Sequence, residues 1–207
     1  MKCDSIIFDV DGTLWNSCDG VAKCWELAIK ENFGGFRSFT ADDVMSIMGK
    51  LPREICDMLL PEYGDMGLSV FECMASYEMR YLPIFGGIIY DGLEDTLRAL
   101  CKKYPLYIVS NCPAGYIECF LEYSGLADCF SDHLCYGDTG LDKAGNIKRI
   151  IDLHSLLLPL YVGDTLSDEQ SARKSGCGFI HAAYGFGSAE CPDGVICSPS
   201  RLLDLLD

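Results

Sequence analysis

Two carboxylates lie at the end of the first apolar run of the chain, Ser5 to Val10, in the motif Asp9-Val10-Asp11-Gly12. Residues two apart on an extended chain point the same way, so we expect Asp9 and Asp11 to face one pocket. Gly12 permits the sharp turn that follows. Because two acids at a strand end repel each other unless a cation lies nearby, the motif favours chemistry beside a cation over a solvated acidic turn.

Three further segments carry polar groups near predicted strand ends. Val109 is followed by Ser110 and Asn111, Lys143 lies just before a predicted helix, and Asp164 and Asp168 lie in the segment 163–168. Taken singly, the first pair are ordinary turn formers and the lysine is an ordinary surface residue. Ligands bind at the carboxyl ends of strands in open parallel sheets, so we expect all of these groups on one rim.

Carboxylates gathered with one lysine and one hydroxyl suit a hard cation and an anionic substrate. Oxygen ligands favour Mg²⁺, which often binds a substrate phosphate as well. The chain contains neither a G-x-x-x-x-G-K-[S/T] loop nor a G-x-G-x-x-G after the first strand, which argues against nucleoside triphosphate and dinucleotide sites of those types. The three histidines have no metal or triad spacing, and we interpret them as structural.

Predicted strands and helices alternate along the chain after Gly86-Gly87, and they must position these groups. Apolar runs at 106–109, 160–162, 179–181 and 195–197 predict strands, and the segments 93–100, 116–123, 147–153, 167–174 and 202–206 predict helices. This order predicts an α/β fold, a doubly wound parallel sheet with a Rossmann-like core over 1–14 and 87–207. The intervening residues 15–86 are helical in pattern and predict an inserted α-helical cap.

Composition limits the class of protein. The chain has 207 residues, 49% of them hydrophobic, enough for a full core. Its 16 Lys and Arg against 31 Asp and Glu give a net charge of −15, which disfavours nucleic-acid and membrane-surface partners. The chain has no long apolar stretch, and its N-terminus does not resemble a signal peptide. The 13 cysteines are odd in number and include no C-x-x-C pair, which predicts reduced thiols and therefore a cytoplasmic protein. We expect a monomer by default.

These motifs resemble those of the haloacid dehalogenase-like hydrolase superfamily, in its phosphatase branch. Asp9 to Leu14 (D-V-D-G-T-L) resembles the first family motif, Ser110-Asn111 the second, Lys143 the third and Gly163 to Asp168 the fourth. The helical insertion after the first motif is similar to the cap of phosphoglycolate phosphatases and β-phosphoglucomutases. Asn16-Ser17 departs from the Asp-Ser of many relatives at this position, and its effect on the substrate is open.

The resemblance implies a mechanism for hydrolysing a small phosphorylated metabolite. Asp9 would attack phosphorus to form an aspartyl-phosphate, and Asp11 would act as general acid and then general base. Mg²⁺ would be held by the Asp9 carboxylate, the Asp11 backbone carbonyl and Asp164, with Asp168 supporting these ligands. Ser110 and Lys143 would bind the transferred phosphate, assisted by Thr13 or Asn111.

Two alternatives to a phosphatase stay open. A phosphosugar mutase would pass the phosphoryl group to a sugar, and a non-catalytic binding module would keep only the fold. A dehalogenase is disfavoured because Asp11 would have no leaving group to protonate. Substrate choice is expected to lie in the cap near residues 48–53, where Lys50 and Arg53 could face the strand ends; a solvated helix start is the alternative.

Overall fold

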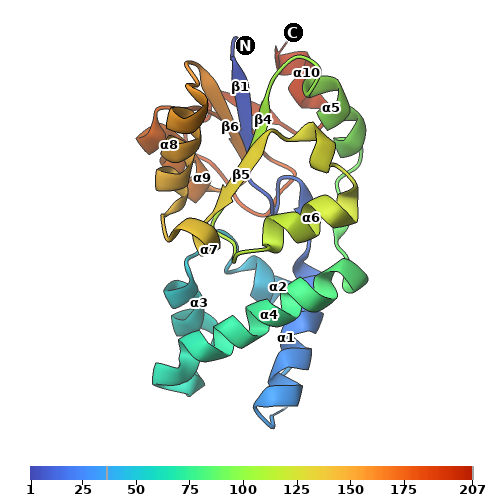
Figure 1. Ribbon diagram of the computed structural model, residues 1–207, viewed down its shortest axis with the longest axis vertical. Helices are drawn as coiled ribbons and strands as arrows, with labels where there is room; N and C mark the ends of the chain where they lie inside the picture. Colours follow the sequence, from blue (N-terminus) through green and yellow to red (C-terminus); the bar gives the residue numbers. More distant parts are fainter. Residues whose placement is uncertain (36, 207) are drawn as a thin grey trace.

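A six-stranded parallel sheet forms the centre of the computed structural model, in the order β5-β4-β1-β6-β7-β8 (Figure 1). The structure describes residues 1–35 and 37–206; positions 36 and 207, which fall in the predicted cap and core, lie outside the described residues. Its strands are β1 (Ser5–Phe8), β4 (Leu106–Ser110), β5 (Asp132–Cys135), β6 (Pro159–Gly163), β7 (Gly178–Ala182) and β8 (Gly194–Ile196). Every pairing between neighbours is parallel, as predicted for a doubly wound sheet.

Both faces of this sheet are buried, which explains why its central strands are continuous apolar runs. Along β1, Ile6 and Phe8 belong to one hydrophobic cluster and Ile7 to the other, because successive side chains point to opposite faces. Ile7 pairs in register with Tyr107 of β4 and Tyr161 of β6, and all three belong to the same cluster. The sheet is therefore the common wall of two cores.

Helices cover the two faces of the sheet. On one face lie α8 (Lys143–His154) and α9 (Leu166–Ser175); on the other lie α5 (Leu93–Leu100), α6 (Tyr116–Ser124) and α10 (Arg201–Leu206) (Figure 1). The short helices α7 (Tyr136–Thr139) and η2 (Ala127–Cys129) complete the core connections. The chain runs from β1 outward to β4 and β5, then returns to β6 on the other side of β1. The strand order thus changes direction at β1, the place where open α/β sheets bind ligands.

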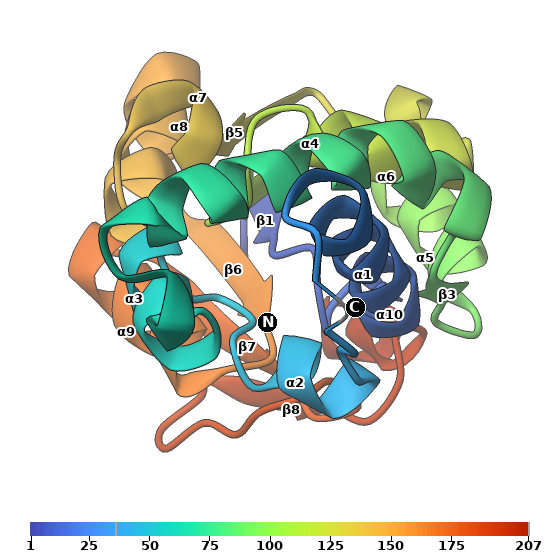
Figure 2. The ribbon, with the colours of Figure 1, turned by 90° about the horizontal axis from the view of Figure 1, so that it is seen from below.

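Four α-helices lie together beyond the carboxyl ends of the strands (Figures 1 and 2). They are α1 (Cys18–Asn32), α2 (Ala41–Met45), α3 (Pro52–Leu59) and α4 (Gly67–Phe85), with η1 (Pro61–Met66) between the last two. The helices α1 and α4 pack along each other, burying Trp25 and Met74. Two short strands, β2 (Trp15–Asn16) and β3 (Ile88–Ile89), pair antiparallel where this helical unit leaves and rejoins the sheet.

Local sequence signals explain several helix starts in this unit. Thr40 caps α2: its hydroxyl accepts a hydrogen bond from the N–H of Asp43, and the Asp43 carboxylate accepts one from the N–H of Thr40. Pro52 occupies the first turn of α3, where its missing N–H costs nothing. Among the described residues, no helix is both long and apolar enough to span a bilayer. All 13 cysteines are free thiols.

Candidate active site

Asp9 and Asp164 meet where β1 and β6 end. The backbone N–H of Asp9 still donates to the carbonyl of Val162 on β6, at 2.9 Å. Gly12 then turns the chain with a φ of +80°, and a Cβ built there would lie 2.1 Å from Oδ2 of Asp164. Only glycine combines this left-handed conformation with so close an approach. The glycine of the first motif is therefore required to bring the two strand ends together.

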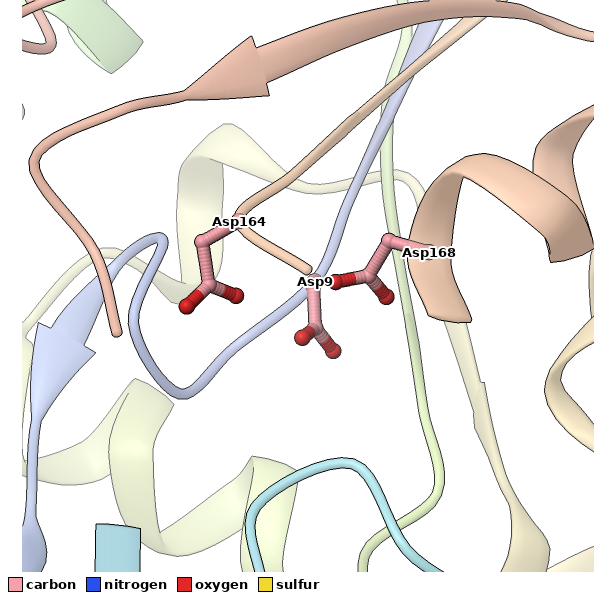
Figure 3. Close-up of side chains that lie close together, drawn as sticks. All are labelled: Asp9, Asp164 and Asp168. Atoms are coloured by element: carbon pink, nitrogen blue, oxygen red, sulfur yellow. The ribbon is translucent and has the colours of Figure 1, made fainter. Parts of the chain in front are cut away.

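Asp9, Asp164 and Asp168 form a buried cluster of three carboxylates (Figure 3). Each offers an oxygen within 4.8 Å of the others, and all three residues are at most 4% exposed. Burial raises the pKa of Asp9 well above its usual range, although the charge of Lys143 opposes that shift. Three carboxylates this close repel one another when ionised, so the cluster is a candidate site for a cation with oxygen ligands.

Lys143 supplies the positive charge already present in this cluster. It begins α8 and is 2% exposed, and its Nζ lies 2.9 Å from Oδ1 of Asp9 and 2.5 Å from Oδ1 of Asp168. Burial alone would lower the pKa of the Lys143 ammonium, but the two carboxylates raise it above its usual value. Taken singly, this lysine is typical of a surface residue, but its place among the motifs predicts it at the strand ends, and the fold turns the side chain inward there.

Asp168 holds Lys143 and also caps a helix. Its Oδ2 accepts hydrogen bonds from the backbone N–H and the hydroxyl of Thr165, at 3.0 and 2.6 Å, while the Asp168 N–H donates to the Thr165 hydroxyl. This reciprocal arrangement fixes the first turn of α9. The side chain is thereby held with Oδ1 directed at the lysine, which positions the ammonium group rather than leaving it mobile.

Asp164 is clamped by the turn that follows β7. Its Oδ2 accepts a hydrogen bond of 2.7 Å from the backbone N–H of Phe186, and a Cβ added at Gly185 would lie 2.3 Å from the Asp164 Cβ. Burial, together with the charge of Asp168, raises the Asp164 pKa to about 7. The other oxygen, Oδ1, is buried and has no hydrogen-bond partner among the described residues. A buried acceptor without a donor suits metal ligation.

Asp11 lies in a different environment from Asp9. Its Oδ1 accepts hydrogen bonds from the hydroxyls of Ser17, at 2.6 Å, and Tyr116, at 2.7 Å, and its carboxylate is outside the three-carboxylate cluster. β1 ends at Phe8 and the chain is already turning at Asp11, so the Asp11 carboxyl accepts from these two hydroxyls instead of joining the cluster. Burial raises the pKa of Asp11, although the two hydroxyl donors lower it.

The polar residues after β4 face the helical unit. Ser110 and Asn111 line a cavity between the sheet and α1–α4, together with Asp11. The Asn111 side-chain amide donates to the carbonyl of Gly49 at 2.8 Å, which joins the core to the loop before α3. Its Oδ1 is buried without a hydrogen-bond donor among the described residues, as is the hydroxyl of Thr13. Asn111 therefore links the predicted cap to the strand ends.

A family model described as "Haloacid dehalogenase-like hydrolase" matches residues 6–182, a span that contains all four motifs. The chain belongs to this haloacid dehalogenase-like hydrolase family. The match confirms the resemblance drawn from the motifs and identifies the chain as a hydrolase. It also agrees with the doubly wound sheet and the helical unit inserted after its first strand.

Similar proteins extend over nearly the whole chain. A curated phosphoglycolate phosphatase from Aliivibrio fischeri is 28% identical over 200 residues, covering 89% of this chain and 86% of the relative. A curated 5'-nucleotidase from Pseudomonas aeruginosa is 22% identical, covering 92% and 87%. The solved structure of a haloacid dehalogenase-like hydrolase from Streptococcus pneumoniae has a TM-score of 0.85 at 23% identity and covers 98% of each chain. That structure supports the fold of this family member.

The two cations predicted for the cap are separated in this hydrolase. Lys50, which precedes α3, lines the cavity with Asp11 and Asn111. Arg53 does not line that cavity; it is exposed and borders the outer grooves. The reason is the amphipathic pattern of α3, which buries Ile55 and turns its first-turn residue Arg53 to the outside.

Two residues that line the cavity, Tyr116 and Glu78, were not predicted from the sequence. Tyr116 donates to Asp11 from the start of α6, a contact that depends on tertiary packing and has no local signal. Glu78 of α4 does have a signal: it occupies a position that helical spacing from Met74 and Leu82 assigns to the buried face. An acid on the buried face of a helix marks either a paired group or a functional one.

Proposed function

We propose that this family member hydrolyses the phosphomonoester of a small metabolite through an aspartyl-phosphate on Asp9, with Mg²⁺ as its cofactor. The observation that carries the proposal is the buried cluster of Asp9, Asp164, Asp168 and Lys143 at the ends of β1 and β6. The names of the curated relatives, phosphoglycolate phosphatase and 5'-nucleotidase, support the same reaction class. Residues 15–86 would act as the cap over this site.

The donor set fits a divalent cation. It consists of carboxylate oxygens: Asp164 Oδ1 is buried without a hydrogen-bond partner among the described residues, and Asp9 Oδ1 is already held near a positive charge, the Lys143 ammonium. We assign the cation to Asp9, Asp164 and the backbone carbonyl of Asp11, with Asp168 supporting it through Lys143. When bound, Mg²⁺ would neutralise charge on the phosphate oxygens and keep Asp9 ionised despite its burial.

The reaction would proceed in two balanced steps. In the first, an Asp9 oxygen forms a bond to phosphorus while the bond to the leaving oxygen breaks, and Asp11 gives its proton to that oxygen. In the second, Asp11 takes a proton from water as the water attacks phosphorus, releasing phosphate and restoring Asp9. The raised pKa of Asp11 favours the protonated form needed first. Lys143 and Ser110 would hold the phosphate oxygens.

Replacement of Asp9 by Asn tests the proposal. Turnover of phenyl phosphate with Mg²⁺, followed as released inorganic phosphate, should fall by at least ~10³-fold because a neutral amide is a poor nucleophile and a poor ligand. Asp19, an exposed acid in the first turn of α1, provides a matched control, and Asp19→Asn should keep its activity. Substantial phosphate release by Asp9→Asn, or none by the unaltered enzyme, would refute the proposed function.

A further inference from the structure

Glu78 is a buried carboxylic acid in the wall of the cavity between core and cap. It is 4% exposed, and the indole N–H of Trp25 on α1 donates to its Oε1. Among the described residues, no other hydrogen bond reaches the Glu78 carboxyl, so Oε2 has no partner. The same cavity is lined by Asp11, Ser110 and Asn111, which belong to the proposed active site.

Asn111 brings a second unpartnered acceptor to this cavity. Its side-chain amide is used by Gly49, while its Oδ1 is buried without a donor in the described part of the chain. A buried acceptor left without a donor costs about 1–3 kcal/mol, so Asn111 Oδ1 favours a ligand that brings a donor, and Glu78 Oε2 offers such a ligand a second acceptor. The arrangement therefore matches a leaving group that carries hydrogen-bond donors.

Charge in the cavity disfavours an anionic leaving group. Glu78 and Asp11 are both acids, and the charge of Asp11 adds to the burial that disfavours ionisation of Glu78. Lys50 is the one Lys or Arg among the described residues that line the cavity. An ionised Glu78 would repel a carboxylate placed here, and the carboxylate would also lose its own hydration.

We propose that Glu78, with Asn111, selects a phosphomonoester whose leaving group is an uncharged, hydroxyl-bearing alcohol and rejects one that bears a carboxylate. The inference rests on the proposed phosphatase function and assigns its substrate class. A substrate hydroxyl would donate to Glu78 Oε2 or to Asn111 Oδ1. Hydrogen bonds of this kind discriminate strongly, because an analogue that cannot donate leaves the acceptors unpaired in a closed site.

The protonation of Glu78 sets how strongly a carboxylate is rejected, while a hydroxyl is accepted in either state. Burial raises the Glu78 pKa to about 8, so both forms are populated near neutral pH. A hydroxyl can donate to the ionised acid or accept from the protonated one, whereas a substrate carboxylate fits only the protonated acid. The discrimination against a carboxylate should therefore increase as pH rises toward 9.

Two esters with the same two-carbon skeleton provide the test: 2-hydroxyethyl phosphate, which ends in a hydroxyl, and 2-phosphoglycolate, which ends in a carboxylate. The enzyme with Mg²⁺ should show at least ~10-fold higher kcat/KM for the hydroxyl ester, equivalent to ~1.4 kcal/mol. In Glu78→Gln this ratio should fall about 10-fold and lose its dependence on pH. Glu72→Gln, an exposed acid on the same helix, is the matched control and should leave the ratio unchanged.

The outcomes separate this inference from the proposed function. If phenyl phosphate is hydrolysed but the hydroxyl ester is not preferred over 2-phosphoglycolate, the substrate class is wrong while the phosphatase assignment stands. An equal ratio in the unaltered enzyme and in folded Glu78→Gln likewise overturns the role of Glu78. If no phosphate is released even from phenyl phosphate, both the function and the inference fail. The substrate comparison on the unaltered enzyme decides the question even if Glu78→Gln does not fold.

Discussion

Lys143 and Asp9 form a buried ion pair, with Nζ of the lysine 2.9 Å from Oδ1 of the aspartate. The two residues come from the start of α8 and the end of β1, so the contact exists only in the folded sheet. The same ammonium group contacts Asp168, which is itself fixed by the cap of α9. One lysine thus balances two carboxylates that are almost completely buried.

The first prediction follows from this pairing. Lys143→Met should lower the free energy of unfolding by about 3–5 kcal/mol in the absence of metal, because it leaves two buried carboxylates without their partner. Lys148, on the same helix, is exposed and within the described part of the chain pairs only with the exposed Asp152, so Lys148→Met should change stability by less than about 0.5 kcal/mol. Urea denaturation of the three proteins measures both values. Equal stability of the two variants would show that the buried pair contributes nothing.

The second prediction concerns the cation. Mg²⁺ at 100 times its dissociation constant should stabilise the fold by about 2.7 kcal/mol, since it would bind only the native carboxylate cluster. Asp164→Asn keeps a side chain able to accept from the Phe186 N–H but loses the charged ligand, so most of this gain should disappear. Melting curves with and without Mg²⁺ test it, with Asp19→Asn as the control. A melting temperature insensitive to Mg²⁺ in the unaltered protein would refute the metal site.

The third prediction uses the different positions of the two cap cations. Lys50 lines the cavity and Arg53 does not, so Lys50→Ala should lower kcat/KM on the best substrate about 10-fold, while Arg53→Ala should change it less than about 2-fold. Steady-state kinetics on both variants and on phenyl phosphate would show whether the effect depends on the leaving group. A larger effect of Arg53→Ala would mean that the cap adopts a different position over the substrate.

The sequence predicted the parts of this structure that have strong local signals. The apolar run before Asp9 and the alternation after Gly87 predicted the parallel sheet, and the helical pattern of residues 15–86 predicted the helices inserted after its first strand. β5 was not predicted, because its sequence Asp132 to Cys135 is half polar and only partly buried at the edge of the sheet. The pairing of β2 with β3 involves two residues each, too short for a pattern.

The site details that were not predicted depend on contacts between distant segments. The position of the Asp11 carboxyl outside the three-carboxylate cluster depends on where β1 ends and on the hydroxyl of Tyr116, which lies on α6. The outward position of Arg53 depends on which face of α3 packs inward. For Glu78, the sequence offers a partial signal, because an acid occupies the buried face of a helix. Only the structure shows that this acid lines a cavity.

The last prediction concerns the pH dependence of stability, which Glu78 should influence. The ordinary pKa of this acid is 4.5, and burial raises it to about 8 in the folded protein. Between these values the folded state holds a proton that the unfolded state has lost, so stability should fall as pH rises from about 4.5 to 8. The titratable groups that interact with Glu78 are Asp11, Cys24, Tyr116 and Cys119.

Glu78→Gln should remove the contribution of Glu78 to the pH dependence of stability and leave the contributions of other groups unchanged. Measured with saturating Mg²⁺, which keeps the metal-binding acids ionised, the melting temperature of Glu78→Gln relative to the unaltered protein should rise by several degrees between pH 5 and pH 8. This scale follows because 1 kcal/mol corresponds to about 2–4 °C in a domain of this size. Glu72→Gln should show no such trend, since Glu72 is exposed. Parallel curves for Glu78→Gln and the unaltered protein would mean that Glu78 titrates near its ordinary value and is not buried in solution.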